Sequence, residues 1–243
     1  MAALALAGCV VEDPPAPTTV VVTVEPWPAG AAAPAELLGG TALAVELDRT
    51  DPWAAAATLL GVRPLTEEMR SLRHVPADVE TFPERLMLEG FECGAFLSGD
   101  VFDESSGLLQ GFLLVDEPFV REAAGADTGA RGAAFAGEQF CAQKIPRPLE
   151  DGAFAWIHLD LATTDDARAT LEHAVAELER TLAEDPAAVL VLASLDATSP
   201  GAPVAIRTAG TPAAAPADPQ AFADHLRSEM ARSLATARQE SDR

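Results

Sequence analysis

The pattern of apolar and polar residues is clearest between residues 153 and 196. The segment "AFAWIHLDL" alternates as a strand does, and "AAVLVLASLD" is apolar on both faces, which is typical of a central strand. Between them lies a helical pattern with Thr164 as its N-cap, followed by Asp165 and Asp166, which favour the positive end of the helix dipole. Its apolar residues recur at spacings of three and four, at Ala167, Leu171, Val175, Leu178 and Leu182. This order of elements predicts a βαβ-like crossover unit, although an antiparallel arrangement through a longer loop also fits.

Earlier segments predict further strands. "TALAVELD" is typical of a strand, and a short helix follows it, capped by Asp51, begun by Pro52 and ended by Gly61. The apolar segments 91–102 and 108–115 flank the polar turn "DESSG", which predicts a β-hairpin.

The C-terminal part completes the predicted fold. A strand is expected over 204–208 and a helix from Pro219 to about Arg238, with Phe222, Leu226, Met230 and Leu234 spaced for one docking edge. We therefore expect a mixed α/β (α+β) domain over 41–243. It has one sheet with a β-hairpin and a βαβ-like unit, helices mainly on one face, and a C-terminal helix.

Residues 9–40 have a different composition, rich in Pro, Ala, Thr and Gly. Prolines at six positions disfavour a regular helix here and favour an extended tether that holds the domain away from a membrane. The β-branched run "TTVVVTV" leaves an alternative open, in which this part forms an edge strand docked on the domain.

The opening residues suggest export. "LAGC" at Leu6–Cys9 resembles the bacterial lipobox, in which a leucine precedes the cysteine by three positions and small residues stand between them. This resemblance implies a partial signal peptide over 1–8, cleavage after Gly8 and a diacylglyceryl group on Cys9. It also implies a bilayer partner and a place on the outer face of the cell membrane. No Lys or Arg precedes Cys9, so we expect translation to start upstream of Met1. An accidental match in an Ala- and Leu-rich chain is the alternative.

The charge balance excludes one class of partner. Acidic residues number 38 against 16 lysines and arginines, giving a formal net charge of −22. A surface of this charge repels phosphate backbones, so nucleic-acid binding is not expected.

Cys93 and Cys141 remain once Cys9 is assigned to a lipid. In an exported chain, an even remainder predicts a disulfide, which would stabilise the fold by roughly 4 kcal/mol in the chain-entropy model. Two buried free thiols are the alternative if the protein stays in the cytosol.

Familiar catalytic motifs are absent from the sequence. It contains no GxSxG elbow, no phosphate-binding GxxxxGK[ST] loop, no HExxH helix and no EF-hand loop. No cofactor or metal site is predicted.

One strand face carries the candidate binding residues. Along "FAWIHLD", Phe154, Trp156, His158 and Asp160 point to one face, and they combine aromatic surface with a titratable pair. An open face of this kind could line a ligand groove. Alternatively, Phe154 and Trp156 pack under another layer and leave His158 and Asp160 at its wet edge.

Two functions remain. The first is a non-catalytic envelope module that binds a small molecule or another envelope protein through this face. The alternative is an unrecognised hydrolase or metal-dependent enzyme that acts on envelope material, with His158 and Asp160 at its polar centre.

Overall fold

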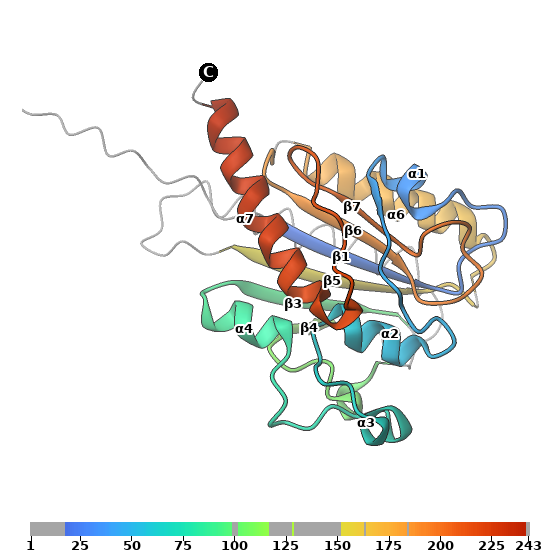
Figure 1. Cartoon of the computed structure of the whole chain (residues 1–243). Coiled ribbons are helices and arrows are strands. Elements are labelled where there is room, and N and C mark those ends of the chain that lie inside the picture. The colour runs from blue at the N-terminus through green and yellow to red at the C-terminus, as the bar shows by residue number, and fades with distance from the viewer. Residues whose placement is uncertain are drawn as a thin grey trace, which may run out of the picture.

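The protein is built around one mixed sheet. The computed structural model describes residues 18–98, 102–116, 128, 152–162, 164–183 and 185–241. Seven strands of these residues are ordered β2-β7-β6-β1-β5-β3-β4 (Figure 1). They are β1 (Thr18–Glu25), β2 (Thr41–Leu43), β3 (Glu92–Leu97), β4 (Leu114–Asp116), β5 (Ala153–Asp160), β6 (Val189–Ser194) and β7 (Val204–Arg207). Strands β6, β1, β5, β3 and β4 are parallel, and β7 runs antiparallel to both β6 and β2.

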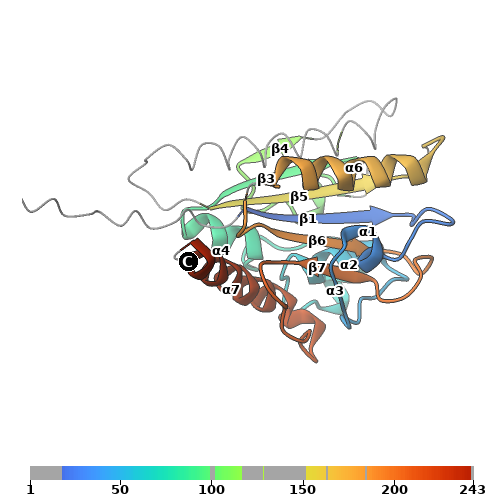
Figure 2. The ribbon, with the colours of Figure 1, turned by 90° about the horizontal axis from the view of Figure 1, so that it is seen from above.

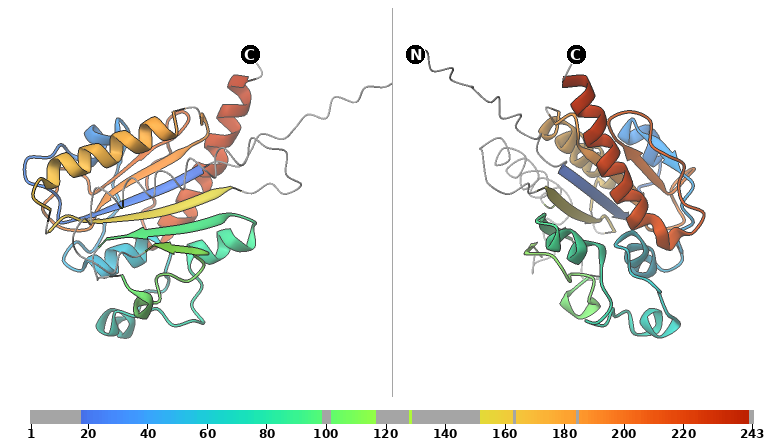
Figure 3. Two further views of the ribbon diagram at one scale, coloured as in Figure 1. Left: turned by 180° about the vertical axis from the view of Figure 1, so that it is seen from behind. Right: turned by 60° about the vertical axis from the view of Figure 1, so that its left-hand side comes forward.

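Helices cover both faces of the sheet (Figure 3). Apolar side chains of α2 (Pro52–Leu59), α3 (Glu67–Leu72), α4 (Phe82–Leu88) and α7 (Phe222–Ser241) pack on one face. Those of α1 (Pro34–Leu38) and α6 (Ala167–Thr181) pack on the other. The mixed α/β class, the single sheet and the C-terminal helix are as expected. The expected one-sided packing describes the majority of these helices, but not α1 and α6.

The central strand β1 lies in the segment that the sequence assigned to a tether. It pairs with β5 on one side and β6 on the other, and all of its residues except Glu25 are buried. Valines alternate between the two apolar layers, with Val21 in one and Val20 and Val22 in the other. The flanking prolines are typical of a linker. The β-branched residues between them, however, suit a strand that is paired on both edges and covered on both faces.

The crossover unit predicted from 153–196 is confirmed. Strands β5 and β6 are both parallel to β1 and lie on either side of it, with α6 between them in the chain. The N-cap of α6 is Asp166 rather than Thr164, because the Asp166 carboxylate accepts a hydrogen bond from the amide of Ala169 at 3.0 Å.

The predicted β-hairpin is wrong, because β3 and β4 are adjacent but parallel. The connecting chain contains a short 3₁₀ helix at Glu104–Ser106 and places Phe102 and Leu108 in the core. These apolar residues were read as strand positions, and a buried connection returns the chain so that β4 can run alongside β3 in the same direction.

Among the described residues, no helix combines the length and apolar character that crossing a bilayer requires.

Candidate functional site

Three carboxylates lie where neighbouring parallel strands end. Glu25 is the last residue of β1, Asp160 is the last residue of β5, and Asp196 follows the end of β6. Strands β5, β1 and β6 are adjacent and point the same way, so their carboxyl ends share one edge of the sheet (Figure 2, right-hand side). The three carboxylates therefore belong to that edge. Ligands of open α/β sheets bind at this carboxyl edge.

Asp196 is held by hydrogen bonds from its surroundings. One carboxylate oxygen accepts from the amide of Trp27 at 3.0 Å, and the other accepts from the amide of Thr198 and the hydroxyl of Ser194, both at 3.1 Å. Asp196 thereby ties the loop after β6 to the loop after β1.

Asp160 is also anchored, through both its side chain and its backbone. Its Oδ1 accepts from the amide of Ala162 at 2.9 Å, and its own amide donates to the hydroxyl of Ser98 at 2.7 Å. That hydroxyl donates to the carbonyl of His158 at 2.9 Å, so the end of β3 fixes the end of β5.

Glu25 differs from the other two carboxylates. Its Oε2 is buried and has no hydrogen-bond partner in the described part of the chain. Burial raises the pKa of Glu25, the nearby Asp160 and Asp196 carboxylates raise it further, and the Arg73 guanidinium opposes them. The result is a carboxylate oxygen with a free lone pair and an increased affinity for a proton.

The predicted aromatic groove is filled by other side chains. Phe154 and Trp156 are fully buried, and the ring of Phe112 packs against both with centroids 6.0 Å apart. Phe82 and Phe102 close the same face at 5.5 and 5.3 Å. The structure therefore agrees with the packed alternative and places Phe154 and Trp156 in the core.

His158 lies beneath this packing rather than at a wet edge. It is 1% exposed, and its Nδ1 is 3.1 Å from the hydroxyl of Thr23, which also accepts a hydrogen bond from the indole of Trp156 at 2.9 Å. Burial lowers the pKa of His158 to about 3. A buried neutral imidazole is unsuited to exchange protons with a substrate near neutral pH, and of the four predicted residues only Asp160 reaches the carboxyl edge.

The structure describes only one cysteine of the predicted pair. Cys93 is buried in β3, and its thiol is 3.7 Å from the carbonyl of Pro83. Cys141 and the predicted lipid site Cys9 lie outside the described residues. The disulfide and the lipid anchor thus stay predictions.

The three carboxylates do not form a recognisable metal centre. Within the described ranges, no group of three or more His, Cys, Asp or Glu side chains is arranged to hold a metal ion.

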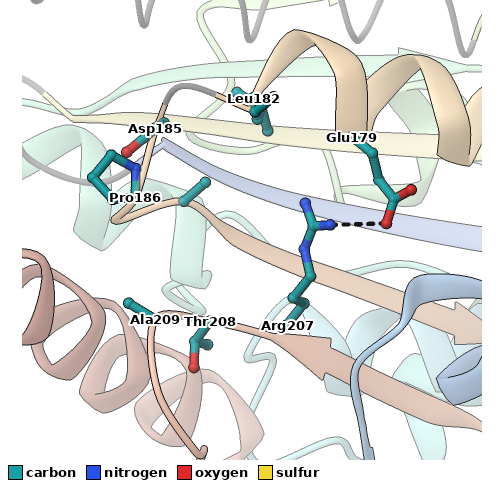
Figure 4. Close-up of a pocket in the computed structure, with 9 residues that line it drawn as sticks. Glu179, Leu182, Asp185, Pro186, Arg207, Thr208 and Ala209 are labelled. Carbon is teal, nitrogen blue, oxygen red and sulfur yellow. Dashed lines mark hydrogen bonds and ion pairs between the residues drawn. The ribbon is translucent and has the colours of Figure 1, made fainter.

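A separate surface pocket lies at the opposite edge of the sheet (Figure 4). It has a volume of about 310 Å³ and is bounded by the end of α6, the approach to β6 and the end of β7. Arg207 crosses it to pair with Glu179 at 2.8 Å, and Asp185 at its far side accepts hydrogen bonds from the amides of Ala187 and Thr18. Because these charged groups already have partners, the carboxyl edge is the stronger candidate for chemistry.

By sequence, the chain matches no protein-family model and no curated protein. By structure it is similar to a protein of the alkaline phosphatase superfamily from Vibrio parahaemolyticus. The TM-score is 0.53 at 13% identity, and the match covers 89% of this chain and 66% of that one. It is also similar to Ps i-CgsB, solved in complex with k-i-k-neocarrahexaose, with a TM-score of 0.57 at 11% identity, covering 89% of this chain and 72% of that one. This chain thus spans about two thirds of the length of these structures, and the likeness concerns the fold.

This likeness corrects the first functional expectation. A non-catalytic binding module was favoured because no catalytic motif was found, yet the fold is similar to that of one structure from the alkaline phosphatase superfamily. The finding favours the alternative, a hydrolase.

Sequence reasoning missed Glu25 and Asp196 for different reasons. Glu25 was hidden in the presumed tether, and Asp196 was read only as the residue after a strand. The available signal was positional, since each carboxylate directly follows an apolar run, as Asp160 does.

Proposed function

We propose that this chain is a hydrolase whose reaction centre is the carboxyl edge formed by Glu25, Asp160 and Asp196. The observation that carries the proposal is the buried Oε2 of Glu25, which has no hydrogen-bond partner among the described residues and lies near two other carboxylates at the end of the central strand. The shared fold supports it independently.

Glu25 is the general base in this proposal. Hydrolysis needs a group that takes a proton from the attacking water, and a carboxylate with a raised pKa does so more readily than an ordinary one. Asp160 and Asp196 use carboxylate oxygens to hold local backbone, so their part is to keep the edge rigid and to raise the proton affinity of Glu25.

Phosphate esters and oligosaccharides are the first substrates to consider. One similar structure belongs to the alkaline phosphatase superfamily, and the other binds an oligosaccharide. An anionic ester would be repelled by three carboxylates, and Arg73 is the nearby cation that could offset this repulsion.

The proposed place of work is the cell envelope. The lipobox-like "LAGC" supports lipid attachment at Cys9, which would hold the domain on the outer face of the membrane near envelope material.

The test is a comparison of initial hydrolysis rates. Purified protein would be assayed on chromogenic phosphate, sulfate, acetate and glycoside substrates, with and without added divalent cations. We expect turnover of at least one of them and a loss of about 10²- to 10⁴-fold in Glu25→Gln, the usual contribution of a general base. The matched control is Glu172→Gln, which removes a solvent-exposed carboxylate on α6 that pairs with Arg168. Absence of turnover by wild type, or a Glu25→Gln rate equal to that of the control, would overturn the proposal.

A further inference from the structure

Residues 209–216, called the strap here, connect β7 to the start of α7 without regular secondary structure and lie along that helix (Figure 1). Their backbone is bound by α7 side chains on successive turns. The Ser233 hydroxyl accepts from the amide of Ala209 at 3.0 Å, and Glu229 Oε1 accepts from the amide of Ala213 at 3.1 Å. Arg232 donates to the carbonyl of Thr211 at 3.1 Å. The strap thus depends on α7 for its hydrogen bonds.

Two buried polar atoms of α7 lack hydrogen-bond partners among the described residues. The Glu229 side chain is completely buried, and its Oε2 makes no hydrogen bond within the described residues. One turn earlier, the His225 side chain is 9% exposed, and its Nε2 has no hydrogen bond and lies 3.9 Å from Glu229 Oε1. Buried polar atoms without hydrogen-bond partners raise the free energy of this packed arrangement, which favours its opening.

Few charges face His225. Glu229 and Arg232 act on it from its own helix. The elements packed nearby, α2, β6, the 3₁₀ turn Pro219–Ala221 and the strap, contain no titratable side chain. Other charged groups of α7 are already in ion pairs. Asp224 pairs with Arg63 and Arg85, and Arg227 pairs with Glu89.

We propose that the strap is an acid-sensitive latch, which stays closed while His225 is neutral and opens when His225 takes up a proton. A protonated imidazole at this position needs water or a full ion pair. The Glu229 oxygen nearest to it is already occupied by Ala213 and Arg232. Lifting the strap would admit water to this stretch of α7 and would break only the hydrogen bonds that α7 side chains make with the strap backbone.

The direction of the pH dependence follows from linkage. Burial lowers the pKa of His225 in the closed state, Arg232 lowers it further and Glu229 opposes them, whereas in the open state the imidazole regains its ordinary pKa of 6.5. The open state therefore binds more protons, and its population rises as the pH falls below 6.5 towards the pKa of the closed state.

Opening would alter the pocket described above. Ala209, the first residue of the strap, and Thr208, which precedes it, form part of the pocket lining (Figure 4). The Ser233 hydroxyl holds this part of the lining in place, because it accepts a hydrogen bond from the amide of Ala209 and donates one to the carbonyl of Ala187 at 3.0 Å. Release of the strap would widen the pocket in acid.

Amide hydrogen exchange tests this latch on the whole protein. Exchange of the Ala209 and Ala213 amides would be followed between pH 7.5 and pH 5, corrected for the intrinsic pH dependence of exchange. Buried amides of β1 would be measured alongside to report global unfolding. In wild type, protection of Ala209 and Ala213 should fall at pH 5 relative to that of β1, because the open state binds more protons.

Two variants separate the latch from general acid sensitivity. His225→Gln should keep the strap protected at pH 5, whereas His173→Gln, which changes an exposed histidine on α6, should behave as wild type. Unchanged strap protection in wild type at pH 5, or equal loss in His225→Gln and wild type, would overturn the proposal.

Discussion

Glu25 and Asp160 occupy the same register position at the carboxyl ends of two adjacent parallel strands. Strands in a sheet lie about 4.8 Å apart, so the two carboxylates are held as neighbours on one face by the backbone itself. Two like charges at such a separation disfavour full ionisation of both groups. Burial is the main cause of the raised pKa of Glu25, and the strand register raises it further by placing Asp160 beside it.

Replacement of Glu25 by glutamine should stabilise the fold at neutral pH. The folded-state pKa of Glu25 is raised, so the folded protein binds the proton more tightly than the unfolded chain, and stability falls as the pH rises through that pKa. Glu25→Gln removes this loss, so its melting temperature should exceed that of wild type by a few degrees at pH 7. The two should converge as the pH falls well below 4.5, where Glu25 is protonated in both the folded and the unfolded state. A lower melting temperature for Glu25→Gln at pH 7 would contradict this interpretation.

Truncation of Trp156 should destabilise the fold strongly. The indole is fully buried, packs against Phe102 and Phe112 and donates to Thr23. Trp156→Ala should therefore cost about 3–5 kcal/mol in the free energy of unfolding, as measured by urea denaturation. Leu72→Ala, at a residue 66% exposed, serves as the control and should change it by less than about 0.5 kcal/mol. Equal effects of the two substitutions would show that Trp156 is not a core residue.

The thiol of Cys93 should be unreactive in the folded protein. Burial raises its pKa to about 12, so very little thiolate is present at pH 8. In reduced, folded protein, alkylation of Cys93 by iodoacetamide should be slower than in unfolded protein by about 100-fold or more. Similar rates in the two states, followed by peptide mass mapping, would refute this. The same mapping without reduction tests the predicted bridge to Cys141, which would appear as one linked pair of peptides.

Cys9 should carry the lipid. Expressed in a bacterial host with a positively charged n-region added before Met1 and with a clickable fatty acid supplied, the wild-type protein should be labelled and should sediment with membranes. Cys9→Ala should lose both properties. Label that persists in Cys9→Ala would show that the resemblance to a lipobox is accidental.

The sequence predicted elements best where one long pattern decided both type and partner. The 153–196 unit combines an alternating strand, a helical stripe and a doubly apolar strand, and each agrees with a crossover. The run that forms β1 was predicted as part of a tether, with an edge strand as the alternative. Its central place in the sheet was not predicted, because prolines flank it and because its burial on both faces depends on α6 and α7, which come much later in the chain.

A single sequence does not reveal the relative direction of two neighbouring strands, or which residues from different strands come together. The pattern from 91 to 115 shows apolar segments but does not encode whether β4 runs with or against β3. Asp160 was predicted because it shares a strand with His158, whereas Glu25 and Asp196 join it only through strand order. The candidate site thus emerges from topology rather than from a local motif.

The pH dependence of kcat/KM, compared with the titration of Glu25 itself, tests the central claim most directly. The carboxyl carbon of Glu25 can be followed by NMR, with Glu25→Gln identifying its signal, while hydrolysis of the best substrate is measured over the same pH range. If Glu25 is the general base, kcat/KM should rise with pH through its pKa, which lies above the ordinary 4.5, and this rise should be missing from the residual activity of Glu25→Gln. A rate profile that does not change where Glu25 titrates, or one that keeps the same rise in Glu25→Gln, would contradict a reaction centre at this edge.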